Sequence, residues 1–382
     1  MQDGRLRDLL IWDDGTDKYE RELIDKVSEY GRVIIFGAGI GGRKTLELLN
    51  KHGMGELVVG FSDNDGEKIN REYLGLPVFP PSELFGINCL ILISSTAFQM
   101  IARQLQEIGI SKEWLFYFQP AGMSLQPSED IKFIRDNIEK FEYAYNLLED
   151  EKSKNIFLYL VNYRITKDMI WLEHMEDLVD AEESQYFDEK ILQDYDFEDG
   201  FVDAGAYIGD TLEQFYLHYP AWQGVYYCIE ASNVMLPKLR QVIADINGKK
   251  ICIFPYALWD GEGEIYFDTS LSSGAGSRIS DKGELVKCDS LDHLIGEKKV
   301  SFLKMDIEGA EKRALLGAKG LIERDRPIMA VCIYHRKEDF FDIPLIIEQI
   351  IKEEYTYYIR QYRYGQSETV LYAMPKSRQR KG

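Results

Sequence analysis

The chain has 382 residues, of which 45% are hydrophobic and 13% aromatic, so it can bury at least one large core, and we expect two. Its 45 Lys and Arg residues stand against 65 Asp and Glu residues, which gives a net charge of −20. This charge repels nucleic-acid phosphates and anionic membrane surfaces. We therefore expect no nucleic-acid partner, and we expect the short basic tail 376–382 to be disordered.

The N-terminus has neither the apolar region nor the small-residue cleavage site of a signal peptide, and no apolar run of about 18 residues could span a bilayer. We expect a cytoplasmic protein without membrane insertion. The five cysteines form no CxxC pair and several lie in strand-like runs, so we interpret them as structural thiols. They are Cys89, Cys228, Cys252, Cys288 and Cys332.

Two stretches share one pattern: an apolar strand, a glycine-rich turn, an amphipathic helix and a second strand that ends in an acid. The first begins with RVIIFGAGIGG at residue 32 and the second with DGFVDAGAYIGD at residue 199. Each is typical of the opening βαβ unit of a doubly wound sheet, whose buried parallel strands are apolar throughout. We therefore predict an α/β protein with two doubly wound Rossmann-like domains joined by a helical connector. The predicted boundaries are 1–120, 121–194 and 195–382.

The first domain carries a dinucleotide-type fingerprint. Gly37, Gly39 and Gly42 fit G-x-G-x-x-G between a strand and a helix, and Asp63 follows 21 residues later at a strand end. The Arg-Lys pair directly after Gly42 favours a pyrophosphate. NAD or a nucleotide sugar would suit this site, although no Tyr-x-x-x-Lys pair for hydride transfer follows. The alternative is a domain that keeps the fold and binds nothing.

Further along, strands are predicted at 89–94 and 114–118, with a helix between them. Residues 128–195 have few glycines and carry apolar residues at three- and four-residue spacing, which predicts packed helices that dock on the second domain. The second domain continues with strand-like runs that alternate with helices and end in a hairpin-like pair. These runs are KICIFPYALWD, GEIYFD, VSFLKMD, IMAVCIYH, YTYYIRQYRYG and ETVLYAMP.

The first turn of the second domain differs from the dinucleotide fingerprint. Asp203, Gly205 and Gly209 give the spacing D-x-G-x-x-x-G, a wider turn that suits a ligand without a pyrophosphate, with an acid placed for a cationic amino or sulfonium group. Glu230 ends the next strand, where its two oxygens can accept hydrogen bonds from both hydroxyls of a ribose.

The third strand of this domain delivers Ala257 and Leu258 where an adenine ring would lie. Ribose, adenine and a cationic end together favour S-adenosylmethionine over a dinucleotide. The alternative is that Asp203 caps a helix and Glu230 is a solvated acid.

The run VSFLKMDIEGAE places Asp306 and Glu308 just past the fourth strand, beside the turn after the first. A hydroxyl acceptor needs a base, and these acids are candidates. His335, directly past the fifth strand, is the preferred candidate because its ordinary pKa suits a base at neutral pH. Alternatively, Asp306, Glu308 and His335 bind a divalent ion. We interpret Glu311 as support for the following helix.

These motifs together resemble the FkbM family of S-adenosylmethionine-dependent methyltransferases. The resemblance rests on FVDAGAYIGD, IEAS, YALWD, CDSLDHL and above all LKMDIEGAE, and it covers about residues 195–375. It implies methyl transfer to hydroxyl groups, often of sugars or polyketide-derived compounds. The residues that it implies as cofactor contacts are Asp203, Gly205, Gly209 and Glu230. We predict further cofactor contacts at Tyr207, Asp210, Ala257, Leu258 and Asp306.

The resemblance also concerns the methyl group and the cofactor pocket. Asp306 and Glu308 would face the transferred methyl, and Tyr207 stands where the family often has a small polar residue. The segment before the first strand would fold over the pocket with Gln185, Tyr186 and Phe187, unless it is an ordinary packed helix. The first domain resembles the nucleotide-binding domains that precede sugar-modifying enzymes.

We therefore expect an O-methyltransferase that acts on a sugar, a sugar nucleotide or a related glycan precursor, perhaps for a surface polysaccharide. The alternative is an NAD- or nucleotide-sugar-binding protein whose second domain is a non-catalytic interaction module. The Ser- and Gly-rich stretch 268–284 is a lid or a plain hairpin connection, and its Arg278 and Lys282 would suit a phosphorylated acceptor. The oligomeric state stays open, a homodimer included.

Overall fold

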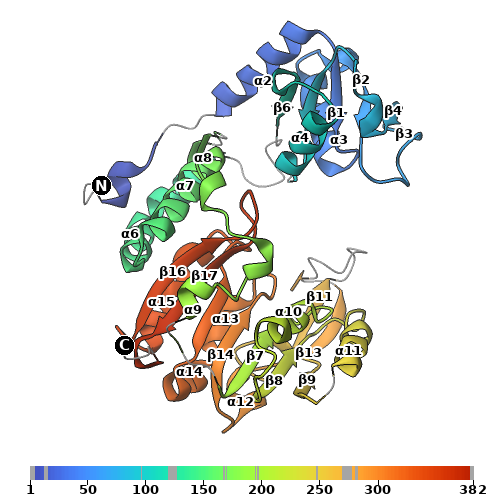
Figure 1. The fold of residues 1–382 in the computed structure, drawn as a ribbon. Coiled ribbons are helices and arrows are strands. Elements are labelled where there is room, and N and C mark those ends of the chain that lie inside the picture. Colours follow the sequence, from blue (N-terminus) through green and yellow to red (C-terminus); the bar gives the residue numbers. More distant parts are fainter. Residues whose placement is uncertain are drawn as a thin grey trace. The chain divides into compact units, whose positions relative to one another are not determined.

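The computed structural model describes residues 5–12, 16–95, 97–118, 127–166, 168, 170–193, 195, 198–246, 248–268, 278–279 and 283–378. They form two compact units (Figure 1). The N-terminal unit comprises residues 10–136 and 159–173, and the C-terminal unit comprises residues 1–9, 137–158 and 174–382. The segment predicted as a separate connector thus contributes helices to both units. None of the helices in the described part of the chain is long and apolar enough to cross a membrane.

The N-terminal unit is built on a six-stranded sheet of order β3-β4-β2-β1-β5-β6. All neighbours run parallel except β3 and β4. The strands are β1 Val33–Phe36, β2 Val58–Ser62, β3 Glu72–Tyr73, β4 Leu76–Phe79, β5 Leu90–Ile93 and β6 Leu115–Tyr117. Strands β1 and β5 are buried along their whole length, which explains their unbroken apolar sequences. The strands predicted at 89–94 and 114–118 are confirmed.

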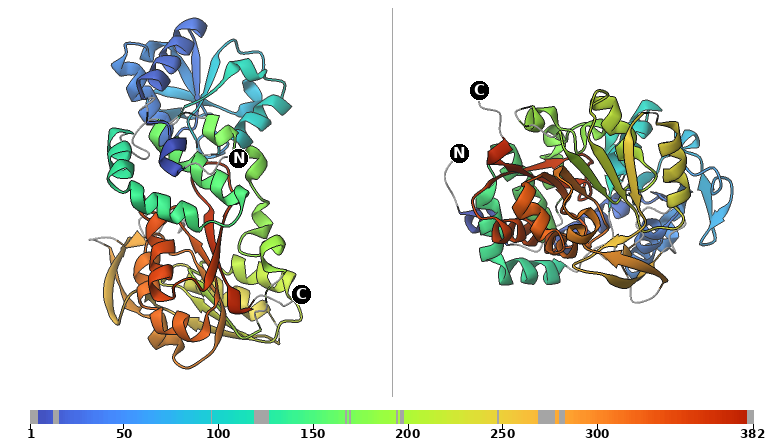
Figure 2. Two further views of the ribbon diagram at one scale, coloured as in Figure 1. Left: turned by 90° about the vertical axis from the view of Figure 1, so that its left-hand side faces the viewer. Right: turned by 90° about the horizontal axis from the view of Figure 1, so that it is seen from below.

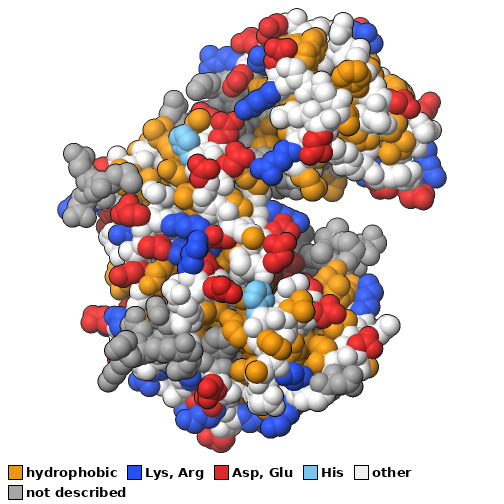
Figure 3. Space-filling model, in the orientation of Figure 1, with side chains coloured by type: hydrophobic (Ala, Val, Ile, Leu, Met, Phe, Trp, Pro, Cys, Tyr) orange, Lys and Arg blue, Asp and Glu red, His pale blue; other side chains and the backbone are white. Residues whose placement is uncertain are grey.

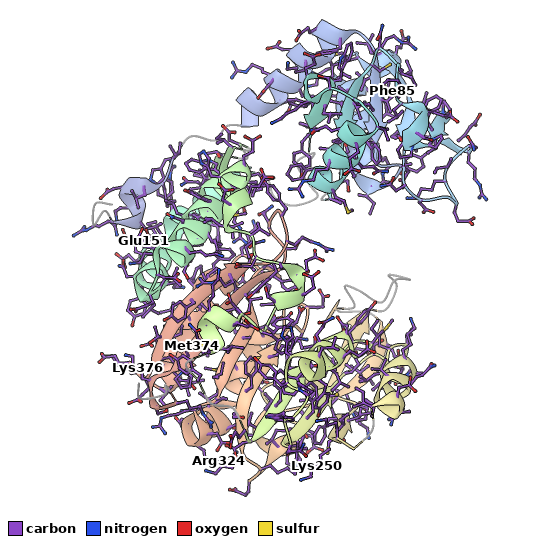
Figure 4. The ribbon with its side chains drawn as sticks, in the orientation of Figure 1. Phe85, Glu151, Lys250, Arg324, Met374 and Lys376 are labelled. Carbon is purple, nitrogen blue, oxygen red and sulfur yellow. The ribbon has the colours of Figure 1, made fainter. Side chains whose placement is uncertain are left out.

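The N-terminal unit also contains helices and short 3₁₀ turns (η). They are α2 Thr16–Tyr30, α3 Ile40–Lys51, η1 Gly55–Leu57, η2 Pro81–Glu83, α4 Phe98–Glu107, η3 Lys112–Trp114, α5 Pro127–Asp136 and α8 Ile170–Glu173. The core lies between α2, α3 and the sheet, where Leu23, Val27 and Leu49 pack on strand residues. Phe85, labelled in Figure 4, is 64% exposed and belongs to the surface of this unit.

The C-terminal unit is built on a seven-stranded sheet of order β16-β17-β15-β14-β7-β8-β9. Its strands are β7 Gly200–Ala204, β8 Val225–Ile229, β9 Lys250–Phe254, β14 Val300–Met305, β15 Ile328–Cys332, β16 Tyr355–Gln361 and β17 Thr369–Pro375. The predicted hairpin is confirmed, since β17 pairs antiparallel with β16. It also pairs antiparallel with β15, so the last strand of the chain lies inside the sheet.

The predicted third strand of this unit is divided in two. Strand β9 ends at Phe254, and β10 Ala257–Leu258 belongs to a separate four-stranded sheet of order β10-β13-β11-β12. Pro255 lies at the break, and it has no N–H with which to continue the ladder. The other strands of the small sheet are β11 Gly263–Asp268, β12 Arg278–Ile279 and β13 Glu284–Asp289. Most of the predicted lid 268–284, with Lys282 and the Arg278 side chain, lies outside the described residues, as do residues 379–382 of the tail.

Helices cover both faces of the large sheet. One face packs against α9 Glu189–Leu192, α10 Asp210–His218 and α11 Leu236–Asp245, and Phe201 of β7 stacks there between Tyr226 and Phe302 with ring centroids 4.7 and 4.6 Å apart. Figure 2 shows the orange helices on the other side. The remaining helices and turns of this unit are α1 Leu6–Leu9, α6 Ile138–Leu147, η4 Glu176–Leu178, η5 Glu182–Ser184, α12 Leu291–Ile295, α13 Glu311–Leu316, α14 Lys319–Asp325, α15 Asp339–Ile350 and η6 Lys376–Arg378. Helix α7 Glu151–Thr166 begins in this unit, and its residues from 159 onward belong to the N-terminal unit.

The parallel strands bring distant loops to one edge of the large sheet. Strand β14 pairs with both β7 and β15, so the loops after these three strands are neighbours. Lys250 and Arg324, labelled in Figure 4, lie at the opposite end, where β9 begins and where the chain approaches β15. Acidic and basic side chains are interspersed over the molecular face in Figure 3.

Candidate active site

A pocket of about 340 Å³ lies at the carboxyl ends of β7, β8 and β14. Eight predicted site residues line it, namely Gly205, Tyr207, Asp210, Glu230, Ala257, Leu258, Asp306 and Glu308. Residues that line it and were not predicted include Glu182, Thr211, Ser232, Met235, Tyr256, Lys304, Ile307, Tyr334, Arg363 and Glu368. The predicted residues Asp203, Gly209 and His335 are not part of this lining.

The backbone around the pocket is strained. Eight described non-glycine residues have a positive φ, and half of them line the pocket. These four are Tyr186, Tyr207, Glu308 and Glu368, with φ between 48° and 68°. Left-handed conformations of such residues cost free energy and persist where the surrounding structure enforces them, commonly at functional sites.

Gly205 allows two strand ends to approach each other. It has a φ of 84°, and a Cβ at this position would lie 1.8 Å from the carbonyl oxygen of Asp306. Gly209 plays another part: it precedes α10 with a φ of 95°, and its missing side chain leaves room for Leu239 and Val242 of α11. The structure therefore assigns Gly209 to helix packing, whereas Gly205 shapes the pocket wall.

The sequence suggested that Asp203 presents a free carboxylate to the pocket, but the structure shows it paired elsewhere. It is fully buried, its Oδ1 lies 3.0 Å from Nζ of Lys304, and its Oδ2 accepts a hydrogen bond of 2.9 Å from the Tyr226 hydroxyl. Lys304 also donates to the carbonyl of Gly205 at 2.8 Å. Burial lowers the pKa of Lys304, but the charges of nearby aspartates outweigh it and raise this pKa. Lys304 is therefore a cationic residue of the pocket lining that sequence analysis missed.

Glu230 lies at the tip of β8, as predicted. Its Oε2 accepts a hydrogen bond from the backbone N–H of Tyr207 at 2.8 Å, and its Oε1 accepts one from that of Ser232 at 2.7 Å. Burial raises the pKa of Glu230 although these hydrogen bonds oppose the shift. Ala257 and Leu258 are buried beside it and form an apolar wall.

The other end of the pocket is acidic. Asp306 accepts a hydrogen bond at Oδ2 from the hydroxyl of Tyr186, at 2.9 Å. Glu368 accepts one at Oε2 from the side-chain amide of Gln185, at 2.8 Å. Burial and the charge of Asp306 raise the pKa of Glu368. Tyr334 reaches both carboxylates, with distances of 3.4 Å to Asp306 and 3.5 Å to Glu368.

The predicted lid residues divide between the pocket and the core. Gln185 and Tyr186 line the pocket. Phe187 is 1% exposed, and its ring lies 5.9 Å from that of Phe215 in the hydrophobic core. For Phe187 the alternative prediction, ordinary packing in the core instead of a lid over the pocket, therefore applies.

His335 is surrounded by carboxylates. Its Nε2 lies 3.3 Å from Oδ1 of Asp306 and 3.6 Å from Oε2 of Glu308, and its Nδ1 lies 2.9 Å from Oε1 of Glu311. Burial lowers the pKa of His335, but these neighbours outweigh it and raise the pKa to about 9. A histidine that is protonated at neutral pH and stands outside the pocket lining does not fit the role of free general base.

Glu311 does more than support a helix. It lies in the first turn of α13, and its Oε1 accepts a hydrogen bond of 2.9 Å from the N–H of Ile307, in keeping with the predicted structural role. The same carboxylate is fully buried against His335. The link between the two could not be found in the sequence, because it joins elements that follow different strands.

In the N-terminal unit the fingerprint residues also come together. Gly42 needs the absence of a Cβ, which would lie 2.0 Å from the carbonyl oxygen of Gly37, whereas the space beside Gly39 is open. Asp63 turns toward this loop and accepts hydrogen bonds at Oδ2 from the N–H of Ala38, at 2.8 Å, and from Lys68, at 3.1 Å. A nucleotide at this loop stays a prediction.

Comparisons with known proteins address the family. Residues 203–362 match the sequence model of the methyltransferase FkbM domain. The C-terminal unit contains an FkbM methyltransferase domain. Residues 29–116 of the N-terminal unit match the family described as C2185-like, N-terminal. A comparison with curated proteins found no match.

Among solved structures, the methyltransferase domain and the rest of the chain resemble the methyltransferase FkbM from Methylobacillus flagellatus KT. The identity is 21%, 92% of each chain is covered, and the TM-score is 0.66, so the two proteins share a fold. An rRNA methylase from Streptococcus thermophilus has 14% identity, covers 49% of this chain and 92% of its own, and has a TM-score of 0.32. Aeropyrum pernix fibrillarin with bound S-adenosyl-L-methionine has 13% identity, coverage of 46% and 66%, and a TM-score of 0.31.

Proposed function

We propose that the protein is an S-adenosylmethionine-dependent O-methyltransferase whose acceptor is a hydroxyl of a sugar, a sugar nucleotide or a related glycan precursor. One observation carries the proposal: a single pocket joins the carboxylate of Glu230 and its apolar wall to an acidic end around Asp306. The first half suits a nucleoside and the second suits a hydroxylated acceptor.

The residues of the pocket fit the parts of S-adenosylmethionine. Glu230 is held by two backbone N–H groups, and each of its oxygens can accept a further hydrogen bond from a ribose hydroxyl. Ala257 and Leu258 would contact the adenine ring. Lys304 would pair with the methionine carboxylate and Asp210 with the amino group, because both line the pocket near Gly205.

When bound, the cofactor supplies a methyl group on a sulfonium sulfur, which keeps the bonding electrons as the acceptor oxygen forms the new bond. The chain must align the acceptor oxygen with that methyl, and much of the rate gain comes from this alignment. It must also accept the hydroxyl proton. Glu368 suits this step better than His335, because it lines the pocket and because burial raises its pKa toward neutrality.

The acceptor class follows from the polar groups at the acidic end. Gln185, Tyr186 and Tyr334 line the pocket there beside Asp306 and Glu368. Amide, phenol and carboxylate groups can each bond a neighbouring hydroxyl of a polyol. The carboxylates disfavour an anionic group at the reacting end, so the phosphates of a sugar nucleotide would lie away from it.

The test is methyl transfer from labelled S-adenosylmethionine to a panel of glycan precursors. We expect label on a neutral hydroxylated acceptor. The second candidate function is an NAD- or nucleotide-sugar-binding protein with a non-catalytic methyltransferase fold, which the arrangement of Asp63 on the glycine loop favours. NAD binding together with the absence of both transfer and S-adenosylhomocysteine binding would overturn the proposal in favour of that candidate.

A further inference from the structure

We propose that Asp306, Glu308 and His335 form a binding site for one divalent cation, with Mn²⁺ as the best-suited ion, and that Glu311 positions the histidine for it. The site lies at the acidic end of the pocket, where Asp306 and Glu308 belong to the lining. Cation binding can be measured without any reaction, but its role in catalysis rests on the proposed methyl transfer.

The candidate ligand atoms lie at distances that suit a metal ion. Nε2 of His335 lies 3.3 Å from Oδ1 of Asp306 and 3.6 Å from Oε2 of Glu308. In a six-coordinate site with metal–ligand bonds of about 2.1 Å, adjacent ligand atoms lie about 3 Å apart. Both distances from Nε2 are therefore close to the separation of neighbouring ligand atoms in one coordination shell. The ligand atoms of Asp306, His335 and Glu311 also lie within 4.8 Å of one another.

Nε2 of His335 is a buried nitrogen without a hydrogen-bond partner among the described residues. The His335 side chain is 7% exposed, and its Nε2 makes no hydrogen bond to any described residue. A buried polar atom without a hydrogen-bond partner costs free energy. The nitrogen faces two carboxylates that reach the pocket, and a cation among the three groups would satisfy it.

Neighbouring residues hold the candidate ligands in place from behind. Glu311 stands at Nδ1 of His335 and is itself fixed by the N–H of Ile307. A carboxylate at one ring nitrogen holds the proton there, which is the usual arrangement behind metal-binding histidines. A cation at Nε2 would replace the proton on that nitrogen, so its binding releases a proton. Likewise, Tyr186 donates to Oδ2 of Asp306, while Oδ1 lies toward His335 and also accepts a hydrogen bond of 3.4 Å from Tyr334.

The backbone that presents Glu308 has a left-handed conformation. Its φ of 56° is followed by a φ of 94° at Gly309, where a Cβ would lie 2.9 Å from Nε of Arg336. A solvated strand-end acid needs no such turn. The chain accepts this conformation at the position that places the carboxylate beside His335.

The donor set selects the ion. Two carboxylate oxygens suit Mg²⁺, Ca²⁺ and Mn²⁺, whereas an imidazole nitrogen suits transition ions, so Mn²⁺ accommodates both. With three protein ligands, further coordination positions stay open toward the pocket. An acceptor hydroxyl that bound there would have a lower pKa, which would ease the loss of its proton to Glu368.

The test uses the full-length protein after removal of metals with a chelator. Loss of the free Mn²⁺ signal in electron paramagnetic resonance measures binding. We expect one ion per chain, with binding abolished in His335→Asn and in Asp306→Asn. Glu311→Gln should keep the stoichiometry but lower the affinity about 10- to 100-fold, because it removes only the positioning contact.

His293→Asn is the matched control. His293 also contacts a carboxylate, with Nδ1 2.6 Å from Oδ2 of Asp289, but its side chain is 70% exposed and it is not part of the pocket lining. This variant should bind Mn²⁺ like the parent. Circular dichroism and S-adenosylhomocysteine binding show whether each variant is folded.

The proposal is overturned if the parent binds no Mn²⁺, or if a folded His335→Asn binds it unchanged. A parent that binds Mn²⁺ but not S-adenosylhomocysteine would contradict the proposed function and leave the cation site supported. The two failures are thus distinguishable.

Discussion

Asp203 and Lys304 form a buried ion pair that joins two central strands of the methyltransferase domain. The carboxylate of β7 lies 3.0 Å from the ammonium of β14, and their side chains are 0% and 3% exposed. The lysine also donates to the carbonyl of Gly205, so the pair fixes the turn that forms the pocket wall. An acid that the sequence suggested for the cofactor thus acts on the pocket through the lysine.

Lys304→Met is expected to destabilise the C-terminal unit by about 3–5 kcal/mol, because it leaves the Asp203 carboxylate buried without its cation. Urea denaturation measures this loss. The double variant with Asp203→Leu should recover much of it, since no charge is then left unpaired. Equal stability of Lys304→Met and the parent would contradict this account of the pair.

Gly205→Ala is expected to abolish S-adenosylhomocysteine binding and to lower stability. Its φ of 84° alone costs about 1–3 kcal/mol for a non-glycine residue, and the new Cβ meets the Asp306 carbonyl. Gly261→Ala is the control, because a Cβ at Gly261 meets no atom within 4 Å. A Gly205→Ala protein that binds as the parent does would show that the close approach is unnecessary.

Asp339 makes the stability depend on pH. Burial and the charge of Glu311 raise the pKa of this carboxyl from 3.8 to about 7 in the folded protein. Between these two pKa values the folded state therefore binds a proton that the unfolded state releases. The contribution of Asp339 to the free energy of unfolding is complete below about pH 4 and is lost as the pH rises toward 7. The loss is on the order of 4 kcal/mol. The free energy of unfolding, measured by urea denaturation at several pH values, should change less between about pH 4 and pH 7 in Asp339→Asn than in the parent. An equal change in both proteins would argue against the raised pKa.

Glu368→Gln tests the proposed base. We expect turnover to fall about 10²- to 10⁴-fold while S-adenosylhomocysteine still binds, because the amide cannot accept the proton. Glu183→Gln, an exposed acid outside the pocket lining, should keep full turnover. Full turnover in Glu368→Gln would move the proton acceptor to another group.

Much of the strand pattern could be predicted from the sequence. Parallel strands buried on both faces are mostly apolar, so the apolar runs at β1, β5, β7 and β14 could be predicted as buried strands. The position of Glu230 at the carboxyl edge of the sheet could also be predicted, because this acid directly follows the apolar run of β8. The exception is the third strand of the C-terminal unit, where Pro255 ends the ladder inside an apolar stretch.

The acidic end of the pocket was harder to predict because its parts are distant in sequence. Lys304 stands within an apolar run, and this lysine at a buried strand position was the one available signal for its ion pair. Glu368 belongs to the turn between β16 and β17, and only the insertion of β17 beside β15 brings that turn to the carboxyl edge. The charge of His335 depends on three carboxylates whose distances no sequence pattern gives.

The measurement that tests the central claim most directly is calorimetric titration of the full-length protein with S-adenosylhomocysteine. The account predicts one binding site per chain, which Glu230→Ala abolishes and Asp63→Ala, in the N-terminal unit, leaves intact. Glu230→Gln, which keeps the size of the side chain, should weaken binding in a folded protein. Absence of binding to the parent protein, or undiminished binding by a folded Glu230→Ala variant, would contradict the account.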